Sequence, residues 1–307
     1  MDPRRHIRMR AFAKITLSLG VKDARPDGYH DLETVFQSLA LHDTLDCRPG
    51  RGPLTLECDD PQVPVDGRNL VWRAARHLWR ALGHGGEPHG VAMTLTKQVP
   101  MQAGLGGGSA DAAAALVALS ALWGGGRPVV DLAEVAARVG ADVSYFLMGG
   151  TALGLARGEH LYPLPDLPPC HVVLALPGFG VSTAEAYGWL DADRAGAGRR
   201  RVRVAARSAF SLRGWPARTL IVSNDLEAPV ARRHPEIARL RDLLASSGAM
   251  AAAMTGSGSA VFGLFESPVT ARRAARAVAQ SGAVSMLTCT LDRRAYLKAL
   301  AAPARGF

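Results

Sequence analysis

The sequence predicts a protein of two lobes in which strands and helices mix, of the α/β or α+β class. Strand-like alternation and helix-like spacing of apolar residues both occur in each half of the 307 residues. A segment with four prolines, YPLPDLPPC at 162–170, separates the halves. We therefore expect one lobe at residues 1–162 and another at 163–307, a length that suits two ordinary domains.

Strands and helices alternate along the first half. Four segments alternate apolar and polar residues as strands do: 8–20, 32–41, 52–60 and 89–100. The turn RPDGYH, with Pro26 and Asp27-Gly28, joins the first two. Three segments have helical spacing: 67–82, 109–123 and 131–140. Ser109 is the expected N-cap of the second helix, and Asp111 is expected in its first turn.

The second half begins with a short apolar run at 171–178 that predicts a buried strand. Residues 191–218 are rich in Arg, Ala and Gly without clear periodicity, which favours a loop or an insertion. The glycine-interrupted segment 249–265 predicts a pair of strands. Helices are expected on either side of this pair, at 234–248 and 267–282.

The formal net charge of +9 favours a solvated basic surface over a nucleic-acid site. Arginine-rich stretches such as RRRVRVAAR at 199–207 carry no interleaved aromatic residues and match no nucleic-acid module. A positive field also suits a small anionic substrate. Thirty-two arginines accompany only four lysines, at positions 14, 22, 97 and 298. A compact ammonium does different work from a guanidinium, so each lysine is a candidate functional residue.

The sequence predicts a cytoplasmic protein without a membrane segment. The basic N-terminus MDPRRHIRMR is not followed by the apolar stretch of a signal peptide. The apolar run from Ala112 to Trp123 is too short to cross a bilayer. The four cysteines have no metal-site or redox spacing, and we expect them to be reduced and incidental.

A glycine-rich loop, PMQAGLGGGSAD at 100–111, lies between a predicted strand and a predicted helix. Glycines let backbone N–H groups approach an anion, and the helix N-terminus adds partial positive charge. The natural ligand is a triphosphate. The loop is not a Walker A loop, since no glycine precedes a lysine, and the dinucleotide fingerprint G-x-G-x-x-G also fails. A flexible turn is the alternative for the glycines taken alone.

The segment PMQAGLGGGSADAAAAL closely resembles the phosphate-loop signature of the GHMP kinases. Four further segments resemble the same family in the same order, and together the five span most of the chain. They lie at 13–45, 140–159, 223–230 and 254–265. The resemblance implies an α+β fold with an N-terminal nucleotide-binding lobe, a C-terminal ferredoxin-like lobe and an active site between them.

The resemblance implies an ATP- and Mg²⁺-dependent kinase that transfers phosphate directly to a hydroxyl. Asp142, in VGADVSYF, matches the catalytic aspartate and would accept the hydroxyl proton. Lys14, in FAKITL, matches the active-site lysine, which would orient the nucleophile and meet charge on the phosphate. The metal ligands are not assigned. Taken alone, such an aspartate is usually a cap and such a lysine usually faces solvent.

The resemblance places the ATP phosphates on the glycine loop. Its residues are Pro100, Met101, Gln102, Ala103, Gly104, Leu105, Gly106, Gly107, Gly108, Ser109 and Ala110. Ser109 is expected to contact a phosphate oxygen or magnesium. Asn69 and Lys97 align near the adenine and ribose, although a helix N-cap also explains Asn69. The motif TGSGS at 255–259 closes on the loop and either contacts phosphate or supports the loop.

One branch of the family, whose substrate carries a cytosine and a diphosphate, shares the turn RPDGYH. That resemblance places Tyr29 and Tyr187 on the two faces of the cytosine, with His30 hydrogen-bonded to it. Phe36 is a pocket wall or a core residue, and Thr183 completes the expected substrate set. Two positions depart from the family pattern, since Thr16 replaces an asparagine and Ser144 a proline. Thr16 lacks the amide donor that an asparagine offers the substrate.

Three alternatives remain open on these residues. Another GHMP small-molecule kinase, of the homoserine or mevalonate type, would have no use for the Tyr-His turn. A catalytically silent nucleotide-binding sensor would not need Lys14 and Asp142. A basic nucleic-acid binder would lose affinity steeply with salt. We expect a monomer or a weak homodimer whose partner is a small cytidyl diphosphate substrate.

Overall fold

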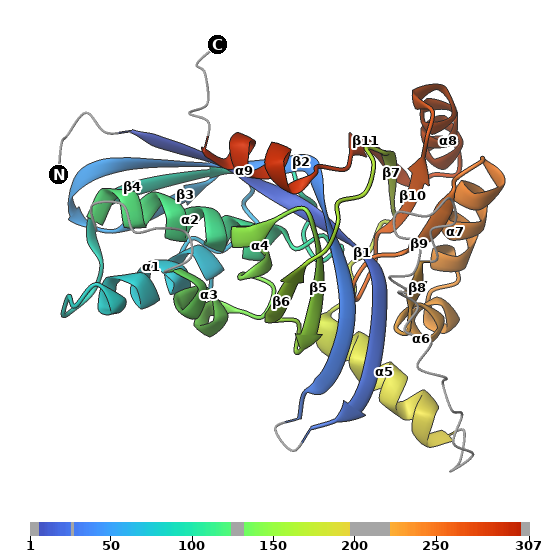
Figure 1. Ribbon diagram of the computed structural model, residues 1–307, viewed down its shortest axis with the longest axis horizontal. Helices are drawn as coiled ribbons and strands as arrows, with labels where there is room; N and C mark the ends of the chain where they lie inside the picture. The colour runs from blue at the N-terminus through green and yellow to red at the C-terminus, as the bar shows by residue number, and fades with distance from the viewer. Residues whose placement is uncertain (1–5, 26–27, 124–131, 197–221, 302–307) are drawn as a thin grey trace.

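A computed structural model describes residues 6–25, 28–123, 132–196 and 222–301 of this chain. It has two lobes, each built on one β-sheet with packed helices (Figure 1). The α+β class is confirmed, because the two sheets are largely antiparallel and the helices pack beside them. Pro26 and Asp27 of the predicted turn, and most of the segment 191–218, lie outside the described residues.

The first sheet is built on two long antiparallel strands, β1 (Ile7–Ala24) and β2 (His30–Pro53). The strand order is β3-β4-β2-β1-β8, and the hairpin β5-β6 attaches to β2. The remaining strands are β3 (Thr55–Cys58), β4 (His89–Thr96), β5 (Thr151–Ala156), β6 (His160–Pro163) and β8 (Ser223–Asn224). The strands predicted at 8–20, 32–41 and 89–100 are thus confirmed, with β1 and β2 longer than expected.

The core of this lobe forms around α2 (Gly107–Trp123), which is apolar on nearly all sides and therefore buried. It packs on β1 and β2, and α1 (Leu70–Ala81) lies against it. Two shorter helices complete this side, α3 (Ala133–Val139) and α4 (Tyr145–Met148). The last helix, α9 (Arg293–Ala301), returns to the same lobe and contributes Tyr296 to its core.

The second lobe is a four-stranded antiparallel sheet in the order β11-β7-β10-β9. This order matches the predicted ferredoxin-like arrangement. Its strands are β7 (His171–Leu176), β9 (Ala251–Met254), β10 (Val261–Phe265) and β11 (Val284–Cys289). Its helices are α5 (Thr183–Gly196), α6 (Glu227–Arg233), α7 (Glu236–Ser246) and α8 (Pro268–Gln280). α7 and α8 pack on the sheet as amphipathic helices (Figure 1).

Three expectations need correction or qualification. Helix α2 begins at Gly107, so Ser109 lies inside its first turn and is not the N-cap. Residues 191–196 belong to α5, because the apolar side chains of Ala186 and Leu190 fix that helix in the core despite its weak periodicity. The boundary at 162/163 remains a prediction. Two elements that follow it in the chain, β8 and α9, belong to the first lobe.

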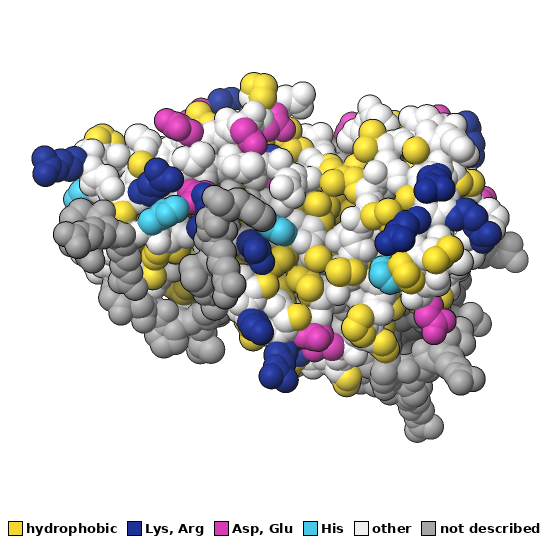
Figure 2. Space-filling model, turned by 90° about the horizontal axis from the view of Figure 1, so that it is seen from above, with side chains coloured by type: hydrophobic (Ala, Val, Ile, Leu, Met, Phe, Trp, Pro, Cys, Tyr) yellow, Lys and Arg dark blue, Asp and Glu magenta, His cyan; other side chains and the backbone are white. Residues whose placement is uncertain are grey.

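Positive side chains are scattered over the face of the molecule that Figure 2 shows. Figure 2 shows Lys and Arg side chains in separate groups on one face, with hydrophobic side chains in the middle of that face. No helix in the described part of the chain is long and apolar enough to cross a membrane.

Candidate functional site

The glycine loop leads from β4 to α2 and has a backbone that only glycine tolerates at two positions. Gly104 and Gly106 have φ angles of +74° and +73°, which L residues rarely adopt. A Cβ on Gly104 would lie 2.0 Å from the carbonyl oxygen of Thr255, and one on Gly106 would lie 2.6 Å from Cζ of Phe146. The loop is therefore pressed against both lobes.

The motif TGSGS at 255–259 supports this loop from the second lobe. The Thr255 hydroxyl donates to the carbonyl of Gly104 (3.2 Å), and the amide of Ala260 donates to the carbonyl of Ala103 (3.2 Å). The same Thr255 oxygen accepts from the amide of Thr16 at 3.0 Å. One threonine thus ties the loop to β1, which favours the supporting role of the motif.

The open side of the loop is the N-terminus of α2. The first N–H groups of a helix have no acceptor within it and carry partial positive charge. Gly108 is exposed, while Gly107 and Ser109 are half-buried, so these amides can be reached from solvent. Such an end binds phosphate well. Ser109 lies in this first turn beside the same opening.

Lys14 and Asp142 meet beside the loop. The Nζ atom of Lys14 lies 3.9 Å from Oδ2 of Asp142. The lysine side chain is 5% exposed and the aspartate 36%, so the cation is fixed and the carboxylate can be reached. The Nζ also donates to the Thr16 hydroxyl (3.0 Å) and lies 5.2 Å from the centre of the Phe36 ring. The structure brings this predicted pair together.

An irregularity in β1 presents Lys14 to the loop. The register with β2 shifts between Phe12 and Lys14 and again between Thr16 and Ser18. Such bulges re-aim side chains and free backbone groups from the ladder. The backbone amide of Lys14 consequently donates to the carbonyl of Leu105 in the glycine loop at 3.0 Å.

Burial lowers the pKa of Lys14, because an apolar environment disfavours the ammonium, while the charge of Asp142 opposes this change. The hydroxyl of Thr16 is buried and accepts a hydrogen bond from the Lys14 ammonium, so this threonine positions the cation. Phe36 is buried between Lys14 and Tyr145, with its ring 4.9 Å from the tyrosine ring. Phe36 is a core residue whose ring also lies against the Lys14 ammonium.

A second group of predicted residues lies where β2 begins and α5 crosses it. His30 is buried, its ring is stacked on Tyr187 at 5.3 Å, and its Nε2 lies 2.9 Å from Oδ1 of Asp191. Burial and the charge of Asp142 both raise the pKa of Tyr187. Tyr29, by contrast, is 59% exposed, and the guanidinium of Arg157 lies 5.4 Å from its ring centre.

Thr183 lies at the start of α5, where its hydroxyl is 3.1 Å from that of Ser257 in the supporting motif. Both hydroxyls are at the surface, next to the glycine loop. Asp191 was missed by sequence analysis because it falls in the segment expected to be a loop. Its signal is its place four residues, about one helical turn, after Tyr187.

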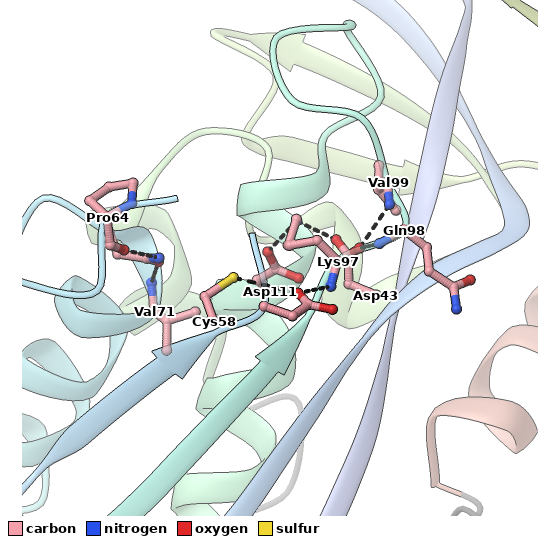
Figure 3. Close-up of polar contacts among 10 residues, drawn as sticks. Asp43, Cys58, Pro64, Val71, Lys97, Gln98, Val99 and Asp111 are labelled. Carbon is pink, nitrogen blue, oxygen red and sulfur yellow. Dashed lines mark hydrogen bonds and ion pairs between the residues drawn. The ribbon is translucent and has the colours of Figure 1, made fainter. Parts of the chain in front are cut away.

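Asn69 and Lys97 are engaged elsewhere in the fold. Asn69 is the N-cap of α1: its side chain accepts from the amide of Val71 and donates to the carbonyl of Pro64. Lys97 lies buried between the carboxylates of Asp43 and Asp111 (Figure 3). The polar ends of both side chains are engaged in these contacts, and their place near the adenine and ribose remains a prediction.

Sequence analysis missed Asp43 and expected Asp111 in the first turn of a helix, whereas Asp111 lies in the second turn of α2. Both are functional candidates. Asp43 is fully buried and accepts from the amides of Gln98 (2.5 Å) and Val99 (2.8 Å) as well as from Lys97. Burial raises the pKa of Asp111 to about 8, although Lys97 opposes this change. Asp43 lies two residues beyond the strand predicted at 32–41 but inside β2, so the apolar alternation did not single it out.

No group of three or more His, Cys, Asp or Glu side chains in the described residues could hold a metal ion by itself. Magnesium commonly binds through substrate phosphates with one or two protein carboxylates. The donor set fits that arrangement, since Asp142 is a partly exposed carboxylate beside Lys14, whose backbone bonds to the glycine loop.

Comparisons with known proteins add the following. The model of the GHMP kinases N terminal domain matches residues 69–150, and that of the GHMP kinases C terminal domain matches residues 212–284. The chain is 43% identical over 270 residues to a 4-diphosphocytidyl-2-C-methyl-D-erythritol kinase of Solibacter usitatus, covering 86% of this chain and 83% of that protein. It is 42% identical to the kinase of the same name from Pelotomaculum thermopropionicum, covering 92% and 98%.

Solved structures give a similar result. A crystal structure of 4-(cytidine 5'-diphospho)-2C-methyl-D-erythritol kinase superposes with a TM-score of 0.73 at 37% identity, covering 92% of this chain and 99% of that one. A homoserine kinase from Cytophaga hutchinsonii superposes with a TM-score of 0.68 at 20% identity, covering 95% and 96%. At that identity the second likeness concerns the fold alone.

Proposed function

Because this chain belongs to the 4-diphosphocytidyl-2-C-methyl-D-erythritol kinases of the GHMP kinase family, we propose that it transfers the γ-phosphate of ATP to the 2-hydroxyl of that substrate through Lys14 and Asp142. The products are the 2-phosphate and ADP, in non-mevalonate isoprenoid precursor biosynthesis. The observation that carries the proposal is the 3.9 Å approach of Nζ of Lys14 to Oδ2 of Asp142, directly beside the glycine loop.

Asp142 acts as the general base. It accepts the proton of the 2-hydroxyl, and the hydroxyl oxygen forms a bond to the γ-phosphorus. The bond between that phosphorus and the oxygen shared with the β-phosphate breaks, and ADP leaves. The partial exposure of Asp142 gives the hydroxyl access to the carboxylate.

Lys14 holds the base ionised and meets the negative charge of the transferring group. Thr16 and the Phe36 ring fix the ammonium, so no rearrangement is needed as charge develops. The amides of the first turn of α2 hold the ATP phosphates, with Ser109 beside them. Mg²⁺ bound to the phosphates would neutralise their charge, and Asp142 is a partly exposed carboxylate that could bind it.

The cytosine occupies the region of His30 and Tyr187. A buried histidine beside a stacked tyrosine offers a polar edge and an aromatic face, which a flat base requires. Tyr29, exposed at the edge of this region, supplies the second face. Homoserine and mevalonate carry no base for these groups. A cytoplasmic location and a monomer or weak homodimer remain expectations for this enzyme.

Release of ADP by the purified protein tests the proposal. The assay contains ATP and magnesium with 4-diphosphocytidyl-2-C-methyl-D-erythritol, and homoserine and mevalonate are run in parallel. We expect ADP only with the cytidyl substrate. Turnover of another acceptor would keep the chemistry of Lys14 and Asp142 and discard the assignment of His30 and Tyr187. A folded protein that binds ATP and is silent with all three acceptors would contradict the proposed activity and make Thr16 the first residue to test.

A further inference from the structure

A buried cluster of charge lies at the base of the glycine loop and touches none of the proposed catalytic groups. Lys97 precedes the loop and Asp111 follows it, and Nζ of Lys97 lies 2.8 Å from Oδ2 of Asp111. The ion pair therefore joins the two ends of the segment 98–110. Asp43, on β2, accepts a second hydrogen bond from the same Nζ (Figure 3).

Asp43 holds the first end of the loop to the sheet. Its other oxygen accepts from the backbone amides of Gln98 and Val99, the residues through which the chain leaves β4. All three charged side chains are at most 8% exposed, so their bonds are strong in a weakly polar environment. The loop is thus fixed at its start by Asp43 and across its ends by Lys97 and Asp111.

The second end of the loop is the start of α2. A Cβ on Gly107, the first residue of this helix, would lie 3.5 Å from Nζ of Lys97 and 3.0 Å from Cγ1 of Val99. The ammonium therefore lies directly beneath the helix turn whose amides face the phosphate site. A displacement of Lys97 would therefore change the packing beneath that turn.

A carboxyl group at position 111 is energetically unfavourable to bury. Its Oδ2 accepts from Lys97, whereas its Oδ1 has no hydrogen-bond partner among the described residues. Alanine occupies the neighbouring positions of the helix, so the local structure does not require a carboxylate. Burying this carboxyl group beside Asp43 costs free energy, and the bond to Lys97 offsets part of that cost.

We propose that Asp43, Lys97 and Asp111 form a clasp that positions the ATP phosphate loop and thereby sets the affinity for ATP. The three are positioning residues: the clasp acts through the amides of the loop and the first turn of α2. The proposal rests on the assignment of that loop to ATP. The proposal also changes the role of Lys97: its ammonium supports the loop from beneath.

Two substitutions at Asp111 test the clasp. Asp111→Ala removes the acceptor, whereas Asp111→Asn keeps an oxygen that accepts from Lys97. We expect Asp111→Ala to raise the dissociation constant of a non-hydrolysable ATP analogue and the KM for ATP about tenfold, the effect of losing a charged hydrogen bond. Asp111→Asn should recover most of that loss, and the KM for the cytidyl substrate should stay within about twofold.

Asp46→Asn is the matched control. Asp46 is a buried carboxylate on the same strand as Asp43, pairs with Arg8 and His6, and makes none of the loop contacts described above. It should leave the affinity for ATP unchanged. An ATP affinity within twofold of the wild type in folded Asp111→Ala would overturn the clasp, and so would an equal rise of both KM values.

Amide hydrogen exchange keeps the test decisive if Asp111→Ala does not fold. Above pH 8, where Asp111 is ionised, the amides of residues 101–107 in Asp111→Asn should exchange several-fold faster than in the wild type, because a neutral acceptor holds Lys97 less firmly. Unchanged exchange there would contradict the clasp. Binding of the ATP analogue needs no turnover, so failure of the clasp is distinguishable from failure of the proposed reaction.

Discussion

Nζ of Lys14 and Oδ2 of Asp142 lie 3.9 Å apart, with the lysine almost fully buried and the aspartate one-third exposed. This asymmetry suits the different roles that we propose for the pair. A buried cation held by Thr16 is ready before substrate binds, while an accessible carboxylate is free to take a proton. The register shifts of β1 and the start of α4 are what place them beside one loop.

Asp142→Asn removes the proton acceptor and retains the shape of the side chain. We expect kcat to fall by about 10²–10⁴, the usual contribution of general base catalysis. The affinity for an ATP analogue should change less than about threefold, because the loop does not depend on this carboxylate. Single-turnover rates and calorimetric titration measure the two quantities. Turnover like that of the wild type would remove Asp142 from its role.

The low pKa of Lys14 gives activity an alkaline limit. Burial lowers this pKa, so the ammonium is lost at a lower pH than in a solvent-exposed lysine. We expect kcat/KM to fall as pH rises through that value, and Lys14→Arg, slower overall, to lack this limb because a guanidinium stays charged. Between the folded and unfolded pKa values the unfolded chain binds more protons, so this group makes stability rise with pH while activity falls. An identical alkaline limb in Lys14→Arg would contradict the assignment.

Gly106→Ala and Gly108→Ala form a matched pair in the glycine loop. A methyl on Gly106 meets Phe146 at 2.6 Å and Lys14 at 3.2 Å with φ at +73°, whereas one on Gly108 meets its nearest neighbour, Leu70, at 3.8 Å. We expect Gly106→Ala to lower the free energy of unfolding by about 1–3 kcal/mol through overpacking and strain. Gly108→Ala should leave it unchanged or raise it by up to about 1 kcal/mol. Thermal unfolding of the ATP-free protein compares them, and equal effects would argue against the described loop.

Asp111 should make stability depend on pH in an unusual direction. Its pKa is about 8 in the folded chain, far above the ordinary value of 3.8, because of burial. Between these values the folded state keeps a proton that the unfolded state releases, so the free energy of unfolding should fall as pH rises and level off above pH 8. Asp111→Asn should remove this component. Denaturant unfolding of both proteins from pH 5 to pH 9 measures it, and parallel curves would show that Asp111 does not titrate there.

Asp191→Asn weakens the support of His30. The carboxylate lies 2.9 Å from Nε2 of His30, so it fixes the ring orientation and the nitrogen that carries the proton. We expect the KM for the cytidyl substrate to rise about three- to tenfold with the KM for ATP unchanged. Asp193→Asn is the control, since Asp193 is on the same helix and pairs with Arg232 and Arg233 instead. Equal effects of the two substitutions would place the cytosine elsewhere.

Local sequence was sufficient for much of the fold and for the chemical type of the site. Apolar periodicity predicted α1 and α7, and the glycine spacing predicted the loop, because both depend on neighbours within a few residues. Periodicity failed for the last residues of α5, which are helical because Ala186 and Leu190 are anchored in the core of the second lobe. Propensity is a weak guide wherever such tertiary packing decides.

The sequence by itself determined which groups are candidates for phosphate transfer: a glycine loop, a rare lysine, and an aspartate in a matching motif. Only the tertiary structure decided which of them lie together. It placed Lys14 with Asp142, His30 with Asp191, and Lys97 beneath the loop between Asp43 and Asp111. These partners are far apart in the chain, and the approach of two charges depends on strand register and burial, which no local pattern encodes.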